Sequence, residues 1–124
     1  MGAAILIVDD AETVRTQVRN ILEGAGFDVQ EAINGRDALT KLNKVPETRL
    51  ILCDLNMPEM DGISMCKEVH KNAAFKTVPI IMLTAETNPE LKKTGKLNGV
   101  VAWLTKPVNG ENLVFAINKI LGSR

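Results

Sequence analysis

The fold is decided by LILCDLNMPEMDG, residues 50–62. An apolar run of strand length ends there at Asp54, and a loop marked by Pro58 and Gly62 follows. A run that is apolar on both faces of its pleat is typical of a central parallel strand covered by helices on either side. Open α/β sheets bind their ligands at the carboxyl ends of such strands, so Asp54 is a candidate functional residue. A lone aspartate in this place would be interpreted more simply as a helix cap or a turn residue.

Strands and helices alternate along the rest of the chain. Further strands are expected near residues 5–8, 27–33, 78–83 and 100–104, and apolar residues at helical spacing follow them. The dipeptide Asn34-Gly35 is a hairpin signal in isolation, but helical spacing comes next, so we interpret it as a strand-to-helix turn. The alternation predicts an α/β fold with a doubly wound, five-stranded parallel sheet and right-handed crossovers.

The helix expected from Asn88 onward is the weakest of the chain. Asn88 is a good N-cap, and Pro89 suits the first helical position. The interior, however, has only Leu91 and Leu97 as large apolar residues, and Gly95 costs about 1 kcal/mol relative to alanine. We therefore expect a marginal, mobile helix.

Composition narrows the class of protein. At 124 residues we expect a single domain, residues 1–124, with no output domain. A formal net charge of zero argues against non-specific nucleic-acid binding. No apolar run approaches the roughly 20 residues of a membrane span, and the N-terminus lacks the features of a signal peptide. Cys53 and Cys66 are expected to be buried thiols, consistent with a reducing compartment. The composition thus favours a cytoplasmic monomer without membrane insertion.

Four strand ends carry polar groups that suit phosphate chemistry. They are Asp9 with Asp10, Asp54, Thr84 and Lys106. Two unit charges about 4 Å apart interact by about 4 kcal/mol at an effective dielectric constant near 20. Three carboxylates beside one lysine would therefore repel one another unless one is protonated or a cation binds. Hard oxygen ligands of this kind favour Mg²⁺, so the cluster predicts a magnesium site.

Each member of this cluster has a candidate role in phosphoryl transfer. Asp54, alone on the central strand, is the natural nucleophile, and Asp9 and Asp10 would bind the metal. Lys106 would pair with phosphoryl oxygens as a point charge, and Thr84 supplies a hydroxyl donor. The alternative, a row of strand-end caps plus a surface salt bridge, explains each residue singly but explains their convergence poorly.

The motifs resemble those of the receiver domain of two-component response regulators. The resemblance covers the whole chain in order and rests on five motifs, namely Asp9-Asp10, Asp54 with Met57-Pro58, Met60-Asp61-Gly62, Thr84-Ala85 and Lys106-Pro107. It implies the flavodoxin-like fold of that family, with strand order 2-1-3-4-5.

The resemblance also implies a set of roles at the strand ends. Asp54 would accept a phosphoryl group from a phosphohistidine on a partner histidine kinase or phosphotransfer protein. Asp10 would bind Mg²⁺ directly and Asp9 largely through water, while Asn56 would contribute its backbone carbonyl. The peptide bond before Pro107 would be cis. The protein would thus be a signalling phosphoacceptor that catalyses only its own phosphorylation and dephosphorylation, and not a conventional enzyme.

Members of this family switch between two states. By resemblance, the Thr84 hydroxyl would move toward the phosphoryl group while the aromatic residue at position 103 turns inward, and the fourth helix, fifth strand and fifth helix would bind a downstream protein. Trp103 stands where the family usually has tyrosine or phenylalanine, so a larger ring must fit the inward pocket, and this departure predicts an incomplete switch. Asn56, Ala85 and Glu86 would tune the lifetime of the phosphoryl group, as in chemotaxis-type receivers.

These residues favour a stand-alone chemotaxis-type receiver, with two alternatives. One is a receiver that shuttles phosphoryl groups in a phosphorelay, and the other is a receiver-like binding module that is never phosphorylated. An aspartyl-nucleophile phosphatase would have an acid in place of Asn56. A flavodoxin-like electron carrier would have a phosphate-binding loop in place of Asp9-Asp10.

Overall fold

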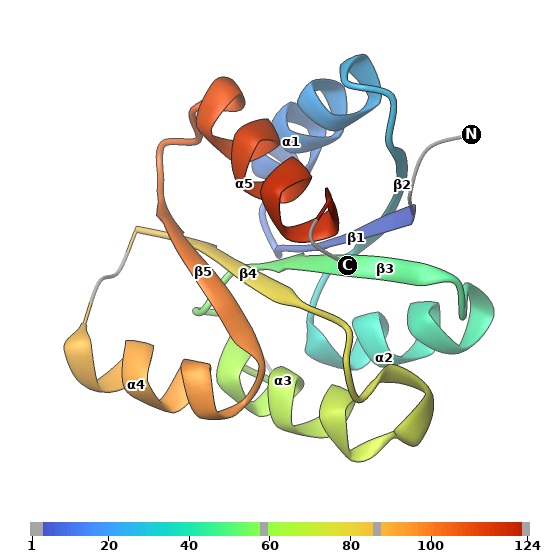
Figure 1. Ribbon diagram of the computed structural model, residues 1–124, viewed down its shortest axis with the longest axis vertical. Helices are drawn as coiled ribbons and strands as arrows, with labels where there is room; N and C mark the ends of the chain where they lie inside the picture. The colour runs from blue at the N-terminus through green and yellow to red at the C-terminus, as the bar shows by residue number, and fades with distance from the viewer. Residues whose placement is uncertain (1–3, 58–59, 86–87, 123–124) are drawn as a thin grey trace.

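The computed structural model describes residues 4–57, 60–85 and 88–122. Five strands alternate with helices along the chain (Figure 1). The strands are β1 (Ala4–Val8), β2 (Asp28–Ala32), β3 (Thr48–Cys53), β4 (Ile80–Thr84) and β5 (Val100–Thr105). The helices are α1 (Glu12–Gly24), α2 (Gly35–Lys44), α3 (Gly62–Lys71), α4 (Pro89–Leu97) and α5 (Gly110–Gly122), with a short 3₁₀ helix at Ala73–Phe75.

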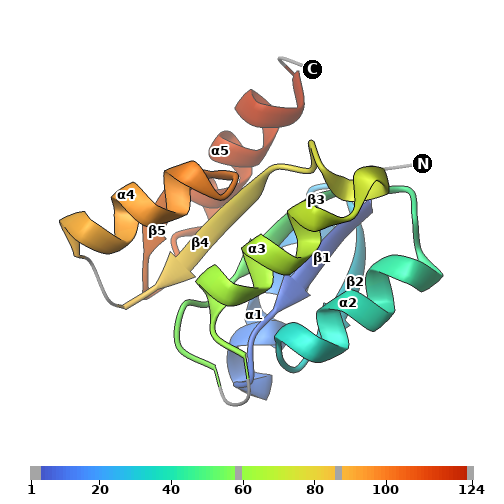
Figure 2. The ribbon, with the colours of Figure 1, turned by 90° about the horizontal axis from the view of Figure 1, so that it is seen from below.

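All neighbouring strands pair in parallel, in the order β2-β1-β3-β4-β5. Helices α1 and α5 cover one face of the sheet, and α2, α3 and α4 cover the other (Figures 1 and 2). The expected doubly wound α/β fold and the strand order implied by the family resemblance are both confirmed.

The layers explain why residues 50–53 of the central strand β3 are all apolar. Successive residues of β3 contribute to opposite sides of the sheet: Ile51 and Cys53 belong to the core under α2 and α3, and Leu50 and Leu52 to the core under α1 and α5. All four are at most 1% exposed. A buried central strand therefore requires the continuous apolar run that the sequence shows.

Four α-helix N-termini of the described chain are capped by side chains close to strand ends, and at α5 the Asn109 side chain accepts a hydrogen bond from Asn112 N at 3.0 Å. Asn34 caps α2, confirming the strand-to-helix turn, and its side chain accepts a hydrogen bond from Asp37 N at 2.8 Å. Asp61 caps α3 and Asn88 caps α4 in the same way. These caps begin the helices immediately after the loops at the carboxyl edge of the sheet, which fixes where those loops can lie.

His70 ties α3 to the segments beside it. The histidine is half-buried, with Nδ1 2.8 Å from the carbonyl oxygen of Asn98 and Nε2 3.0 Å from that of Val78. Gly99 has a φ of 90°, and a Cβ there would collide with the histidine ring. This histidine therefore has a structural role, at a distance in the fold from the strand ends considered below.

No helix among the described residues has both the length and the apolar character that crossing a bilayer requires.

Candidate functional site

The carboxyl ends of β1 and β3 bring three acidic side chains together. Backbone hydrogen bonds extend the sheet past both strands, since Asp9 N–H donates to the Ala32 carbonyl at 3.1 Å and Asp54 N–H to the Val8 carbonyl at 3.0 Å. One carboxylate oxygen from each of Asp9, Asp10 and Asp54 lies within 4.8 Å of the other two. Asp9 and Asp54 are buried, whereas Asp10 is exposed. The predicted convergence of these acids is therefore present, with one acid open to solvent.

Lys106 reaches this acidic group from the other half of the sheet. Its Nζ lies 3.0 Å from Asp9 Oδ2 and 3.3 Å from Asp54 Oδ2. Lys106 follows β5, its backbone N–H donates to the Thr84 carbonyl at 3.0 Å, and the peptide bond to Pro107 is cis. Partial burial acts to lower the pKa of the ammonium, but the hydrogen bonds and charges of the two aspartates outweigh it and raise that pKa. The lysine is thus held in its charged form between the two buried carboxylates.

The donor set fits a divalent metal ion. Three carboxylates outweigh the one positive charge that Lys106 supplies, so a net negative potential remains at their oxygens. Hard carboxylate oxygens with one open, solvent-facing member are the environment that Mg²⁺ prefers, because this ion retains several waters. The residues present therefore suit Mg²⁺.

Comparison with known proteins decides the family. The sequence profile of the response regulator receiver domain matches residues 5–118. This chain belongs to that family.

Named relatives match the receiver domain over nearly all of its length. Protein PilG of Pseudomonas aeruginosa is 36% identical over 116 residues, which cover 94% of this chain and 85% of PilG. Chemotaxis protein CheY1 of Helicobacter pylori is 36% identical over 120 residues, 96% of this chain and 97% of CheY1. The solved structure of chemotaxis protein CheY4 of Vibrio cholerae superposes with a TM-score of 0.91 at 40% identity, covering 96% of this chain and 98% of that one.

The remaining predicted site residues of the receiver domain lie around the acidic group. Thr84 ends β4, between the strands that lead to Asp54 and Lys106, and is only 2% exposed. Asn56 and Ala85 are exposed in the loops that follow β3 and β4. Glu86, the third expected lifetime-tuning residue, lies outside the described residues. The structure therefore places each described site residue at the carboxyl edge of the sheet.

Trp103 of the receiver domain packs against α4. It pairs with Met82 across β4 and β5, is half-buried, and contacts the same core as Leu91. A Cβ at Gly95 would lie 2.8 Å from Trp103 Cζ2. Gly95, which the sequence presents only as a weakness of the helix, thus makes room for the indole.

Arg15 is a contact of the site that the motifs do not indicate. Its Nη1 donates to the backbone carbonyl of Asp9 at 2.8 Å. The detectable signal is modest: Arg15 and Arg19 stand one helical turn apart shortly after the Asp9-Asp10 pair.

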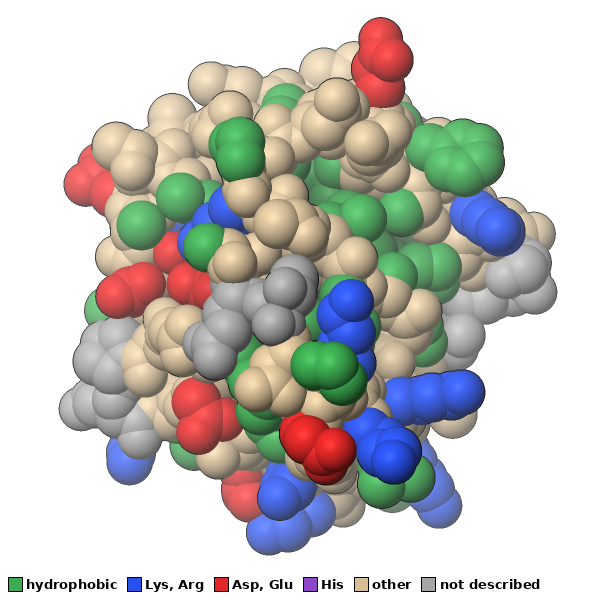
Figure 3. Space-filling model, turned by 90° about the vertical axis from the view of Figure 1, so that its left-hand side faces the viewer, with side chains coloured by type: hydrophobic (Ala, Val, Ile, Leu, Met, Phe, Trp, Pro, Cys, Tyr) green, Lys and Arg blue, Asp and Glu red, His purple; other side chains and the backbone are tan. Residues whose placement is uncertain are grey.

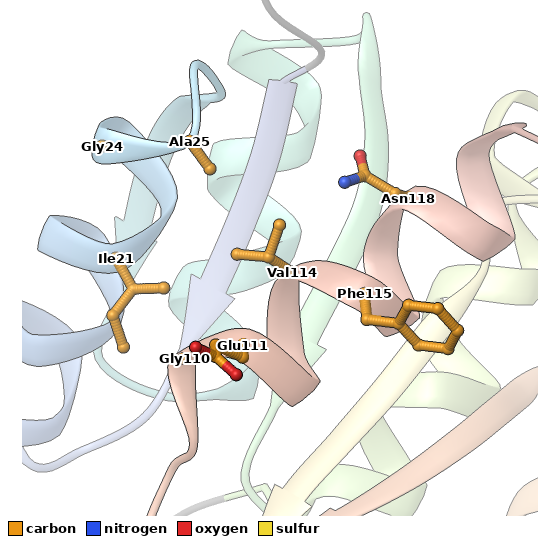
Figure 4. Close-up of a pocket in the computed structure, with 8 residues that line it drawn as sticks. All are labelled: Ile21, Gly24, Ala25, Gly110, Glu111, Val114, Phe115 and Asn118. Carbon is orange, nitrogen blue, oxygen red and sulfur yellow. The ribbon is translucent and has the colours of Figure 1, made fainter.

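A sizeable hollow on the surface lies away from the acidic group formed by Asp9, Asp10 and Asp54. This hollow of about 620 Å³ lies between α1 and α5, where Val114 points toward α1 and Phe115 points away from it (Figure 4). Its described lining is mostly apolar. The acidic group lies instead on the side of the molecule seen in Figure 3, to which the strand arrows of Figure 1 point.

Proposed function

We propose that this receiver domain accepts a phosphoryl group on Asp54 from a phosphohistidine of a histidine kinase or phosphotransfer protein, in a reaction that requires Mg²⁺. The observation that carries the proposal is the convergence of three carboxylates on a lysine that contacts two of them. A row of unrelated helix caps would not place a charged lysine, more than fifty residues away in sequence, against two buried acids.

The residues divide the chemistry among them. A carboxylate oxygen of Asp54 attacks phosphorus and forms an acyl phosphate, while the P–N bond to the donor imidazole breaks and its electron pair stays on that nitrogen. Asp9 and Asp10, with the backbone carbonyl of Asn56, would hold Mg²⁺, which supplies charge neutralisation for the incoming phosphoryl group. Lys106 already contacts Asp54, so its ammonium can form an ion pair with the phosphoryl oxygens once the group is bound there.

Three further residues would govern what happens after transfer. The Thr84 hydroxyl would donate to a phosphoryl oxygen, because Thr84 ends the strand next to that of Asp54. Ala85 is small and exposed, which leaves space for an attacking water, and the polar Asn56 and Glu86 would orient that water. We infer a short-lived acyl phosphate, as suits a signal that must be switched off quickly.

The partner-binding face would be formed by α4, β5 and α5. Leu97, Val101 and Phe115 expose 84%, 54% and 70% of their surface there. Beside them a hollow of about 540 Å³ is lined in part by Lys92 and Lys96, and basic side chains gather in one part of the face seen in Figure 3. Exposed apolar groups flanked by lysines favour a partner that presents acidic and apolar side chains together.

We favour a chemotaxis-type regulator, because CheY1 and CheY4 carry that description and each match covers 96% of the chain. A phosphorelay shuttle would use the same acidic group and differ only in its partners. Transfer of the phosphoryl group from Asp54 onward to a second histidine protein would favour the shuttle.

Intact-mass measurement tests the phosphoacceptor role. After incubation with Mg²⁺ and a small acyl-phosphate donor, the protein should gain the mass of one phosphoryl group, and chelation of the metal should prevent the gain. The Asp54→Asn variant is the matched control, since it keeps the size and shape of the side chain. A wild-type protein that gains no mass would favour the unphosphorylated binding module, and a variant that gains it would refute Asp54 as the acceptor.

A further inference from the structure

Two arginines of α1 share one carboxylate of the edge strand β2. Glu31 Oε1 lies 3.0 Å from Arg15 Nε, and Glu31 Oε2 lies 3.0 Å from Arg19 Nε. Each oxygen of the carboxylate is thus bound to a different arginine, and the two arginines stand on successive turns of the helix. The side chain of Arg15 is 13% exposed and that of Arg19 is 31% exposed. The ion pair between Arg15 and Glu31, which is the nearer to the end of β1, is therefore the more buried of the two.

The two arginines use their remaining donors differently. Arg15 Nη1 donates to the backbone carbonyl of Asp9 at 2.8 Å, whereas Arg19 Nη2 donates to the carbonyl of Val29, in the middle of β2, at 3.0 Å. Each arginine otherwise makes one bond to Glu31 and one to a backbone carbonyl, and Arg19 has in addition an ion pair with Glu23 at 3.7 Å. Only the Arg15 bond touches the segment that carries the acidic group.

The Asp9 carbonyl belongs to the peptide that joins Asp9 to Asp10. The Asp9 side chain is already fixed, because Oδ1 accepts a hydrogen bond from Ala11 N at 2.8 Å and Oδ2 contacts Lys106. Asp10 is exposed, and the orientation of its side chain depends on the plane of the peptide before it. The hydrogen bond from Arg15, on α1, to the Asp9 carbonyl holds the plane of this peptide.

We propose that Arg15, oriented by Glu31, is a positioning residue for the metal-binding pair Asp9-Asp10. The inference rests on the proposed function, since it concerns the affinity of the same acidic group for Mg²⁺. A carboxylate that orients a cationic side chain, which in turn fixes a ligand segment, is an outer-shell arrangement of the kind that tunes metal affinity.

A simple electrostatic effect predicts the opposite sign. The guanidinium is a positive charge close to a cation site, so its removal would favour Mg²⁺ if charge alone mattered. Loss of positioning instead leaves the Asp9-Asp10 peptide free to rotate and weakens binding. The direction of the change therefore distinguishes the two.

Calorimetric titration of the full chain with Mg²⁺ tests the proposal, using Arg15→Met and the matched control Arg19→Met. We expect the dissociation constant to rise about 10-fold in Arg15→Met and to stay unchanged in Arg19→Met, although Arg19→Met loses the same two kinds of contact and the ion pair with Glu23 as well. Arg15→Lys keeps the charge but cannot reproduce the planar fork, so it should also bind weakly.

Several results would overturn the inference. Binding by Arg15→Met that is as tight as wild type, or tighter, would show that the residue acts by charge or not at all. Equal weakening in Arg19→Met would show a general loss of stability. If Arg15→Met does not fold, Arg15→Lys decides by the same comparison. A wild-type protein that binds no Mg²⁺ would instead refute the proposed function and this inference with it.

Discussion

Replacement of Gly95 by alanine should displace Trp103 from its place against α4. An alanine Cβ would lie 2.8 Å from Trp103 Cζ2 and 3.2 Å from Val100 Cγ2. Carbon atoms in favourable contact lie about 3.5–4.0 Å apart, so the indole must retreat by about 0.7 Å or more. The half-buried ring can do so only by turning toward solvent or toward the strand ends.

The two energies that this change involves have opposite signs. Alanine stabilises a helix interior by about 1 kcal/mol relative to glycine, while an extra carbon in a packed contact costs about 1–3 kcal/mol. The net free energy of unfolding should therefore be unchanged or fall by up to about 2 kcal/mol. If the indole moves to the strand ends, the variant should resemble the switched state that the family resemblance implies, in which the residue at position 103 turns inward.

Emission and urea unfolding measure the two parts separately. Trp103 is the only tryptophan and the chain has no tyrosine, so the emission maximum reports this contact directly. Gly24→Ala, at the last residue of α1, is the control for the emission, because a Cβ there meets nothing within 4 Å and leaves the surroundings of Trp103 unchanged. An unchanged emission maximum together with a full 1 kcal/mol gain in stability would refute the reasoning, since alanine would then fit without moving the ring.

Four further predictions concern the acidic group and its neighbours. Lys106→Met should tighten Mg²⁺ binding in calorimetry, because it removes a competing cation. The raised pKa of Lys106 stabilises the folded protein at pH values below the ordinary pKa of 10.5, and this stability is lost as pH rises through the raised pKa. The urea midpoints of wild type and variant should therefore converge only above pH 10.5. Both described cysteines are buried, which raises the pKa of each thiol, that of Cys66 to about 12, so iodoacetamide should label them in urea but not in the native protein at pH 8. Beryllofluoride with Mg²⁺ should shift Trp103 emission in wild type and much less in Thr84→Ala; an equal shift in both would contradict the proposed switch. Ala85→Leu should lengthen the lifetime of the acyl phosphate followed by mass, and an unchanged decay would remove Ala85 from the lifetime-tuning residues.

The fold was predictable because its signals are local. Each central strand holds a short apolar run that ends at a polar residue, and a helix follows, with a side-chain cap after β3 and β4. Once the strands are parallel, their carboxyl ends must share an edge, so the convergence of Asp9 and Asp54 follows from topology. The strand order did not follow from these signals and came from the family resemblance.

The contacts that the sequence did not reveal are those between a side chain and a distant backbone or glycine. Arg15 is interpretable from sequence only as a polar residue of α1, because nothing local indicates that its fork reaches the Asp9 carbonyl. Gly95 carries a local cost, and its compensation lies on a different element, in Trp103. Such pairs become visible only when the packing of helices on the sheet is known.

The contact of Arg15 with Asp9 and the packing of Trp103 on Gly95 lie on opposite sides of the acidic group. The positioning of the metal ligands and the link to α4 therefore belong to different edges of the sheet. From the β2 side, Arg15 and Ala32 hold the carbonyl and the N–H of Asp9, so this edge governs the geometry of the metal ligands. From the β5 side, Lys106 reaches Asp9 and Asp54, and its strand carries Trp103 to α4. The proposed positioning of the metal ligands by Arg15 thus lies away from the proposed partner-binding face, whereas Lys106, the competing cation, follows β5 of that face. A receiver built this way would tune the geometry of its metal ligands through α1 and β2 and would link the charge at the acidic group to α4 through β5.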